Sequence, residues 1–216
     1  MRRRAPPFFV VSGAHGVGKT TVLEACGALF EGRGVAVRRF HHIVDGVPNK
    51  AAHGRSGGRP RAWWGRLVPG PVKMAITATL DELRYARGIN RILAQAAAES
   101  RIALSDRYAY DRLVDLRLRC RPLVQRAAVR VVCALLRHPT LTIMLTDDPA
   151  AVYDRKQELT RDQIERYQND LADLCQRLGA PFVVVSVDGR DPNAVAEQIV
   201  AEILEKARGE GLPAPA

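Results

Sequence analysis

The sequence has 216 residues, of which 47% are hydrophobic, and a formal net charge of +10 at pH 7. A chain of this length and apolar content can bury a sizeable core, which predicts a single domain. It has no apolar segment of membrane-spanning length and no signal-peptide core, which excludes a membrane-spanning protein and predicts a cytoplasmic one. The basic charge favours polyanionic partners such as nucleotides or nucleic acid. The cysteines form no C-x-x-C pair and lack metal-ligand spacing, so buried thiols are expected at Cys26, Cys120, Cys133 and Cys175.

Strands and helices are predicted to alternate along the chain. Short apolar or β-branched runs predict five buried strands, at 8–12, 35–40, 101–106, 140–145 and 181–187. Apolar periodicity and capping signals predict helices at 18–31, 73–100, 108–118, 123–136, 149–158, 160–178 and 193–207. The second helix is either continuous or interrupted near Gly88. This alternation predicts an α/β fold with a parallel sheet and helices on both faces.

Two stretches are predicted to lack regular structure. The segment 41–71 is rich in Gly, Arg and Pro and contains Trp63-Trp64, which indicates a long mobile loop. The segment 209–216 indicates a flexible tail. We therefore expect one domain over 1–208, without internal repeats.

The segment from Gly13 to Thr21 matches a phosphate-binding loop, or P-loop. Gly13, Gly18, Lys19 and Thr20 complete the pattern G-x-x-x-x-G-K-[ST] between a predicted strand and a predicted helix. Glycines let backbone N–H groups converge on phosphate oxygens, and the helix N-terminus adds partial positive charge. The lysine of this pattern reaches the β- and γ-phosphates, and the threonine hydroxyl ligates Mg²⁺. The candidate ATP-binding residues are Gly13, Ala14, His15, Gly16, Val17, Gly18, Lys19, Thr20 and Thr21.

Asp106 and Arg107 are predicted to lie at the carboxyl end of a core strand. In a parallel α/β sheet, this end forms the crevice in which ligands bind. The Asp106 carboxylate can hold Mg²⁺ or its water, and the Arg107 guanidinium can hold a phosphate through two hydrogen bonds. Asp147 and Asp148 form a rival metal site. Because Asp148-Pro149 matches the start of a helix, we interpret that pair as mainly structural.

A basic segment within 147–165 is a candidate lid over the phosphates. Arg155, Lys156 and Arg161 lie around the break between two predicted helices. A lid there would exclude water and bring positive charge to the transition state, and Arg155 is the candidate catalytic residue. The alternative is a solvated, charged helix face, because acidic residues are interspersed.

Residues for the second substrate are predicted from polar and aromatic positions near the expected crevice. Arg84, Tyr85 and Arg87 recur on the helix 73–100 and can line a pocket, and Tyr85 or Tyr108 can stack on a base. The candidate substrate-binding residues are His41, His42, Asp45, Arg84, Tyr85, Arg87, Arg107, Tyr108 and Asp111.

Over nearly the whole chain, these segments resemble the thymidylate kinase family in order and spacing. They are "SGAHGVGKTT", "LDELRYARGINRILAQ", "LSDRYAYD" and the lid segment "RKQEL". The resemblance implies a five-stranded parallel sheet in the order 2-3-1-4-5, phosphoryl transfer from Mg-ATP, and a homodimer as one assembly state. It also implies that Lys19 and Thr20 lie on ATP and Mg²⁺, Asp106 near the metal, Arg107 near the acceptor and Arg155 in the lid.

The chain departs from that family on the acceptor side. Family members usually carry acidic residues where this sequence has Ser12 and His15. The family usually has an Arg-Glu-Pro-Gly element after the second strand, where this chain has His41, His42 and Asp45. The sequence therefore predicts a retained donor side and a changed acceptor side.

The leading hypothesis is a kinase acting on a thymidylate-like nucleoside monophosphate or a related small phosphorylated acceptor. Such an acceptor is already anionic and needs no general base. The first alternative is a kinase for a hydroxyl of a nucleoside or sugar, with His41, His42 or Asp45 as base. An alternative of a different class is a basic nucleotide- or nucleic-acid-binding protein without kinase activity, although RNA-binding motifs are absent. A P-loop ATPase or GTPase switch is the third alternative, and the absence of an N-K-x-D-like base-reading motif weighs against the GTPase.

Overall fold

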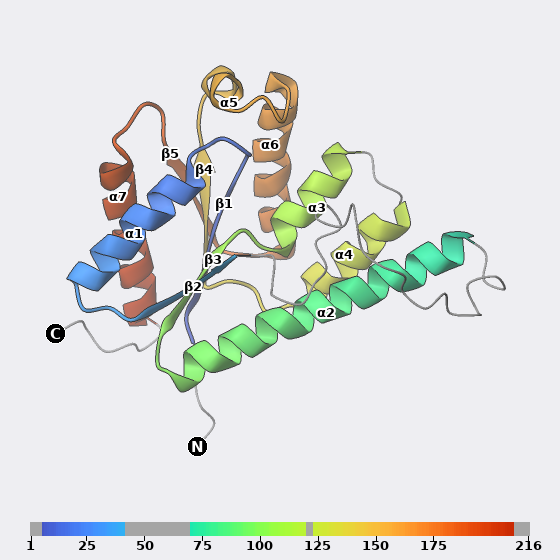
Figure 1. Cartoon of the computed structure of the whole chain (residues 1–216), viewed down its shortest axis with the longest axis horizontal. Coiled ribbons are helices and arrows are strands. Elements are labelled where there is room, and N and C mark those ends of the chain that lie inside the picture. Colours follow the sequence, from blue (N-terminus) through green and yellow to red (C-terminus); the bar gives the residue numbers. More distant parts are fainter. Residues whose placement is uncertain (1–5, 42–69, 120–122, 210–216) are drawn as a thin grey trace, which may run out of the picture.

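The computed structural model describes residues 6–41, 70–119 and 123–209 as one α/β fold (Figure 1). Its five strands pair in parallel in the order β2-β3-β1-β4-β5, which confirms the predicted fold class and sheet order. The strands are β1 (Phe8–Gly13), β2 (Val37–His41), β3 (Ile102–Asp106), β4 (Leu141–Thr146) and β5 (Phe182–Ser186).

Seven helices of the described chain cover the two faces of the sheet. They are α1 (Lys19–Gly32), α2 (Gly70–Ala98), α3 (Ala109–Leu118), α4 (Leu123–Leu135), α5 (Pro149–Arg155), α6 (Arg161–Leu178) and α7 (Pro192–Gly209). Helices α1 and α7 pack together on one face, whereas α2, α3, α4 and α6 cover the other (Figure 1). None of the helices in the described ranges is long and apolar enough to cross a bilayer.

The central strand β1 lies in the deepest part of the core. Every residue of β1 is buried, from Phe8 to Gly13. A parallel strand covered by helices on both sides buries both of its faces, which explains the continuous apolar run. Because β1 lies between β3 and β4, the loop after Gly13 starts beside the carboxyl ends of both neighbours.

The structure settles the continuity of α2, which the sequence left open, and corrects the predicted end of α5. Helix α2 is continuous through Gly88, because Tyr85, Ile89 and Leu93 bury one side of it on both flanks of the glycine. The prediction of a helix to residue 158 was wrong, because α5 ends at Arg155 and Lys156 has extended backbone angles.

Two predicted helix starts are confirmed by their capping contacts. The Asp148 carboxylate accepts a hydrogen bond from the Ala151 backbone N–H, 3.1 Å away, at the start of α5. Thr160 and Gln163 form the capping box at the start of α6. Most of the predicted mobile loop 41–71 lies outside the described residues, but its described ends are regular, because His41 ends β2 and residues 70–71 begin α2. Of the predicted tail, Gly209 ends α7 and residues 210–216 lie outside the described residues.

Candidate phosphate-binding site

The loop between β1 and α1 opens into a pocket of about 420 Å³. Gly13, Gly16 and Gly18 all have positive φ, so the chain turns sharply before the first turn of α1. The pocket is lined by His15, Gly16, Gly18, Lys19, Thr20, Thr21, His41, Asp106, Arg107, Arg155 and Lys156. The structure therefore brings the loop, the ends of β2 and β3, and the segment after α5 into one site.

Gly13 and Gly18 need glycine for different reasons, and their alanine variants test this. A Cβ atom on Gly13 would lie 2.6 Å from the Leu145 carbonyl oxygen of β4, whereas none of the described atoms lies within 4 Å of one on Gly18. We expect Gly13→Ala to lower the free energy of unfolding by about 3 kcal/mol, through both overlap and positive φ. Gly18→Ala should cost about 1 kcal/mol, through φ alone. Urea unfolding compares them, and equal losses would contradict this account of the loop.

The Lys19 side chain closes the loop on itself. Its Nζ donates hydrogen bonds to the carbonyl oxygens of Gly13, at 2.8 Å, and Ala14, at 2.7 Å. Burial, and then the positive charge of Arg107, lower the Lys19 pKa to about 8. This ammonium therefore stays protonated at pH 7 but has poor solvation. An anion that entered the pocket would stabilise it.

Arg107 lies beside the loop in a backbone conformation that is rare for arginine. Its φ of 69° is left-handed. Its N–H donates to the Val11 carbonyl at 2.9 Å, and its own carbonyl accepts from the Ser105 hydroxyl at 2.6 Å. The Arg107 side chain is only 6% exposed, and its Nη1 lies 3.6 Å from Asp115 Oδ2, too far for a good hydrogen bond. The fold thus holds a guanidinium with spare donors in a dry position at the pocket.

Asp106 and Thr20 fit the oxygen ligands that Mg²⁺ requires. Both line the pocket, and Asp106 Oδ1 is buried with no hydrogen-bond partner among the described residues. The other oxygen, Oδ2, lies 3.7 Å from His41 Nε2. Mg²⁺ is usually held by one or two protein oxygens together with phosphates and water, so these two side chains can supply the protein's share. No group of three or more His, Cys, Asp or Glu side chains able to hold a metal occurs in the described ranges.

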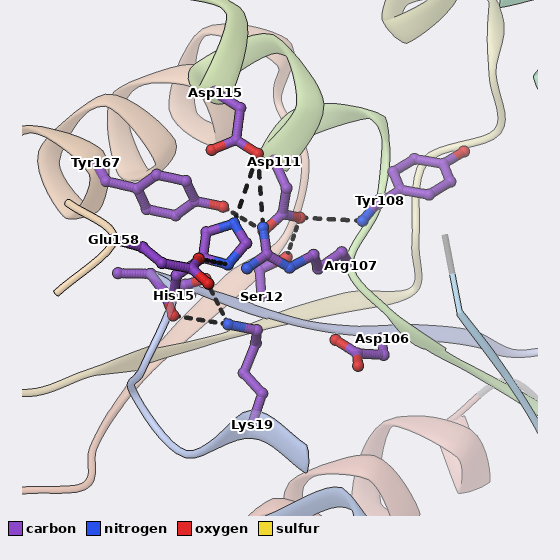
Figure 2. Close-up of polar contacts among 12 residues, drawn as sticks. Ser12, His15, Lys19, Asp106, Arg107, Tyr108, Asp111, Asp115, Glu158 and Tyr167 are labelled. Atoms are coloured by element: carbon purple, nitrogen blue, oxygen red, sulfur yellow. Dashed lines mark hydrogen bonds and ion pairs between the residues drawn. The ribbon is translucent and has the colours of Figure 1, made fainter. Parts of the chain in front are cut away.

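His15 joins the loop to two other segments (Figure 2). Its Nδ1 lies 3.0 Å from Glu158 Oε2, in the segment between α5 and α6, and its Nε2 lies 4.0 Å from Asp115 Oδ2 on α3. Burial, and then the charges of Arg107 and Lys19, lower the His15 pKa to about 4. The imidazole is therefore neutral at pH 7. A neutral Nδ1–H that donates to Glu158 fits the shorter distance.

Three functional interpretations from the sequence are corrected by burial. Tyr85 and Tyr108 are at most 1% exposed and pack in the core, so neither ring is available to stack on a base. Asp111 is fully buried and accepts hydrogen bonds from Ser12 Oγ at 2.6 Å, Tyr167 OH at 2.6 Å and the Tyr108 N–H at 3.0 Å (Figure 2). Both carboxylate oxygens of Asp111 are therefore engaged by the protein's own donors in a fully buried position, and Asp111 is a structural residue.

The other predicted acceptor residues have different positions. Arg84 and Arg87 are exposed on α2 and do not line the pocket, and Arg84 pairs with Asp81 at 3.4 Å. His41 lines the pocket, whereas His42 and Asp45 lie outside the described residues. Within the loop, Ala14 and Val17 are fully buried, so their side chains pack inward.

Arg155 reaches the pocket from the end of α5. Its guanidinium pairs with the buried Asp147 carboxylate, which also accepts from the Asp148 N–H at 2.8 Å. Asp147 is therefore occupied by the protein's own groups, as expected for a structural role. Lys156 also lines the pocket and pairs with Glu158 at 3.0 Å.

Sequence reasoning missed the acidic residues that surround the site. Asp115 lies four residues after Asp111, which places both carboxylates on one side of α3. This four-residue spacing is the feature of the sequence that could have indicated Asp115 as a neighbour of the site. Burial raises the pKa of the Asp115 carboxyl above its usual range, although Arg107 opposes the shift. For Glu158, no local pattern in the sequence indicates contact with a loop so distant along the chain.

The fold and this loop geometry define the class: an α/β protein with a P-loop-like three-layer fold. No protein-family model matches the sequence, and no curated protein matches it. The resemblance to the thymidylate kinase family accordingly rests on the motifs quoted above.

Proposed function

We propose that this protein transfers the γ-phosphoryl group of Mg-ATP to a small phosphorylated acceptor of the nucleoside monophosphate type. The observation that carries the proposal is one pocket in which Lys19 and Arg107, both nearly buried, lie around a glycine-rich loop. Two desolvated cations beside converging backbone N–H groups form a strong site for phosphate anions.

On the donor side, the loop and Lys19 would bind the β- and γ-phosphates. Lys19 would exchange its hydrogen bonds to Gly13 and Ala14 for bonds to phosphate oxygens. Thr20 and Asp106 would hold Mg²⁺, which supplies neutralisation of phosphate charge when bound. The buried, unpartnered Oδ1 of Asp106 supports this role.

On the acceptor side, Arg107 would hold the anionic acceptor, and Arg155 and Lys156 would add positive charge from above the loop. An acceptor phosphate is a nucleophile without loss of a proton, so catalysis reduces to positioning and charge stabilisation. The pocket lining itself contains four cationic side chains, Lys19, Arg107, Arg155 and Lys156, and one carboxylate, Asp106, which supports the binding of two phosphorylated ligands.

A hydroxyl acceptor is the second candidate. His41 lies at the end of β2, directly opposite Asp106 in the sheet register, and its Nε2 lies 3.7 Å from Asp106 Oδ2. An imidazole held in this position can take the proton of an attacking hydroxyl. His41→Ala should then reduce kcat, whereas for a phosphorylated acceptor it should leave kcat within about threefold of the unchanged protein.

Arg107→Ala should raise the acceptor KM by roughly 100-fold, because a bidentate charged contact is lost from a dry site. The KM for ATP should change much less. Steady-state kinetics with each substrate varied in turn measures the difference. Arg107→Lys, which keeps the charge but loses the planar fork, should recover only part of the loss. Equal rises in both KM values would contradict the assignment of Arg107 to the acceptor.

The proposal is tested by ADP formation in a panel of nucleoside monophosphates, nucleosides and sugar phosphates, with Lys19→Ala as control. We expect turnover that depends on a phosphorylated acceptor. ATP turnover without any acceptor would indicate an ATPase. Salt-sensitive binding of mixed nucleic acid without any turnover would favour the binding-protein alternative.

A further inference from the structure

A hollow of about 330 Å³ lies between α1 and the edge strand β2, next to the P-loop pocket. Thr20, His41 and Asp106 line both spaces, so this α1–β2 hollow adjoins the pocket directly. Sites for small molecules usually have volumes of about 300 to 1,000 Å³. The α1–β2 hollow is therefore large enough for one ring system of a ligand whose phosphate lies in the P-loop pocket.

The α1 side of strands β2 and β3 forms one wall of the α1–β2 hollow. Side chains of a strand alternate between the two faces of its sheet. Arg39 lies opposite Leu104 in the strand register, and His41 lies opposite Asp106. All four residues line the α1–β2 hollow, and His41 and Asp106 also line the pocket. Arg39 and Leu104 therefore lie farther from the phosphate site than the other two.

Helix α1 supplies the opposite wall. Thr20, Leu23 and Glu24 line the α1–β2 hollow, and their spacing of three and four positions places them on one side of the helix. Leu23 is buried, as is Leu104 across from it, whereas Glu24 is exposed. The lining thus combines apolar side chains with the Glu24 carboxylate, which accepts hydrogen bonds, and the Arg39 guanidinium, which donates them.

The Arg39 side chain is held against α1. Its Nη1 donates a hydrogen bond to the Leu23 carbonyl oxygen, 3.2 Å away. A Cβ atom on Gly27 would lie 2.7 Å from the same nitrogen, so the guanidinium lies where the glycine leaves room. A guanidinium has five N–H donors in one plane, and this bond takes one of them.

We propose that the α1–β2 hollow binds the nucleobase of the acceptor whose phosphate is held by Arg107. A nucleobase has flat faces and a polar edge of carbonyl oxygens, ring nitrogens and N–H groups. Leu23 and Leu104 would contact the ring. Arg39 would donate to an acceptor atom of the edge, and Glu24 would accept from an N–H group. The base would thus lie on the face of the sheet opposite to α2 (Figure 1). This inference rests on the proposed function, which supplies an acceptor of the nucleoside monophosphate type.

Arg38 provides a matched control for Arg39. It is the preceding residue of β2, but its side chain lies on the α2 side, where it donates to Glu99 at 3.0 Å and Gln95 at 2.8 Å. Replacing either arginine with glutamine removes one positive charge, so the long-range attraction of a phosphate falls similarly. Only Arg39→Gln also removes a guanidinium from the α1–β2 hollow.

Isothermal titration of the full chain tests this inference, with a non-hydrolysable Mg-ATP analogue present throughout. The ligands are the common nucleoside monophosphates and ribose 5-phosphate, which lacks a base. We expect the best nucleoside monophosphate to bind at least roughly tenfold more tightly than ribose 5-phosphate. Arg39→Gln should raise the Kd of that nucleotide by roughly tenfold and leave the Kd of ribose 5-phosphate unchanged. Arg38→Gln should leave both Kd values within about twofold of those of the unchanged protein.

Gly27→Ala is a second variant, which decides the outcome if Arg39→Gln fails to fold. It keeps Arg39 but places a methyl group where the guanidinium lies, and alanine favours the helix, so the variant should remain folded. It should weaken binding of the nucleotide by about threefold or more and leave ribose 5-phosphate unaffected. Circular dichroism establishes folding for each variant.

Two results would overturn the inference. One is that no nucleoside monophosphate binds more tightly than ribose 5-phosphate. The other is that the folded Arg38 and Arg39 variants weaken nucleotide binding equally. Failure of the proposed function is distinguishable, because base-dependent binding that requires Arg39 but leads to no turnover would contradict phosphoryl transfer and leave this inference standing.

Discussion

Replacing Lys19 with alanine should reduce kcat/KM for ATP turnover by at least about a thousandfold, with little effect on folding. The ammonium is the buried cation closest to the loop and donates to the carbonyls of Gly13 and Ala14. In the reaction it would contact the transferred phosphoryl group, where a single buried donor is worth several kcal/mol. Steady-state ADP formation measures the loss, and thermal unfolding controls for stability. Turnover within tenfold of the unchanged protein would contradict the assigned role.

The lowered pKa of Lys19 adds a pH dependence. In the free protein, Lys19 titrates near pH 8 because of burial and Arg107. Below pH 8 the Lys19 ammonium is charged in both the free protein and the nucleotide complex, so nucleotide affinity should not change with pH through this group. Above that pH, binding must take up a proton, so affinity should fall by up to tenfold per pH unit. The last ionisation of a phosphate monoester has a pKa of about 6, so it is nearly complete by pH 8, which leaves the range above pH 8 clear.

Lys19→Arg is the matched control for the pH profile. Arginine stays charged through this range, so the fall in affinity above pH 8 should disappear in the variant. Isothermal titration with a non-hydrolysable ATP analogue gives the Kd at each pH. The same fall in both proteins would assign it to another group.

Asp111→Ala should lower the free energy of unfolding by about 3 to 5 kcal/mol, which corresponds to roughly 10 °C in Tm. The carboxylate is fully buried and accepts three hydrogen bonds, from Ser12, Tyr108 and Tyr167. Its removal leaves buried donors without an acceptor, which costs more than the bonds themselves contribute. Chemical denaturation measures the change.

Two further variants show whether the stability lost in Asp111→Ala comes from its buried hydrogen bonds. Asp173→Ala removes an exposed pair with Arg177 on α6 and should cost under about 1 kcal/mol. Tyr167→Phe removes one donor to Asp111 and should cost about 1 to 2 kcal/mol. A loss below about 1 kcal/mol for Asp111→Ala would show that Asp111 does not hold these segments together.

Much of the fold was predictable because its signals are local. Strand runs such as Phe8–Gly13 are continuously apolar, and the capping box of Thr160 and Gln163 lies within one turn. The loop glycines, Lys19 and Thr20 follow a fixed spacing, so the position of the pocket was predictable too. Asp106 and Arg107 followed from their place at a strand end, because parallel strands end at one edge.

The wrong assignment of Asp111 to the acceptor concerns contacts between segments that are distant along the chain. Asp111 meets Ser12, which is 99 residues away, and Tyr167, which is 56 residues away, so its burial depends on the assembled fold. The burial of Tyr85 had a signal that was not used. Tyr85, Ile89 and Leu93 share one side of α2, and this periodicity indicates a core position rather than a ring free to stack on a ligand.

The most direct test of the proposed reaction is phosphorus NMR of Mg-ATP with each phosphorylated acceptor of the panel. We expect new phosphoanhydride signals of a diphosphorylated product, which appear as fast as ATP disappears and are absent with Lys19→Ala. ATP that stays intact with every acceptor, or that yields only inorganic phosphate, would contradict phosphoryl transfer to a phosphorylated acceptor.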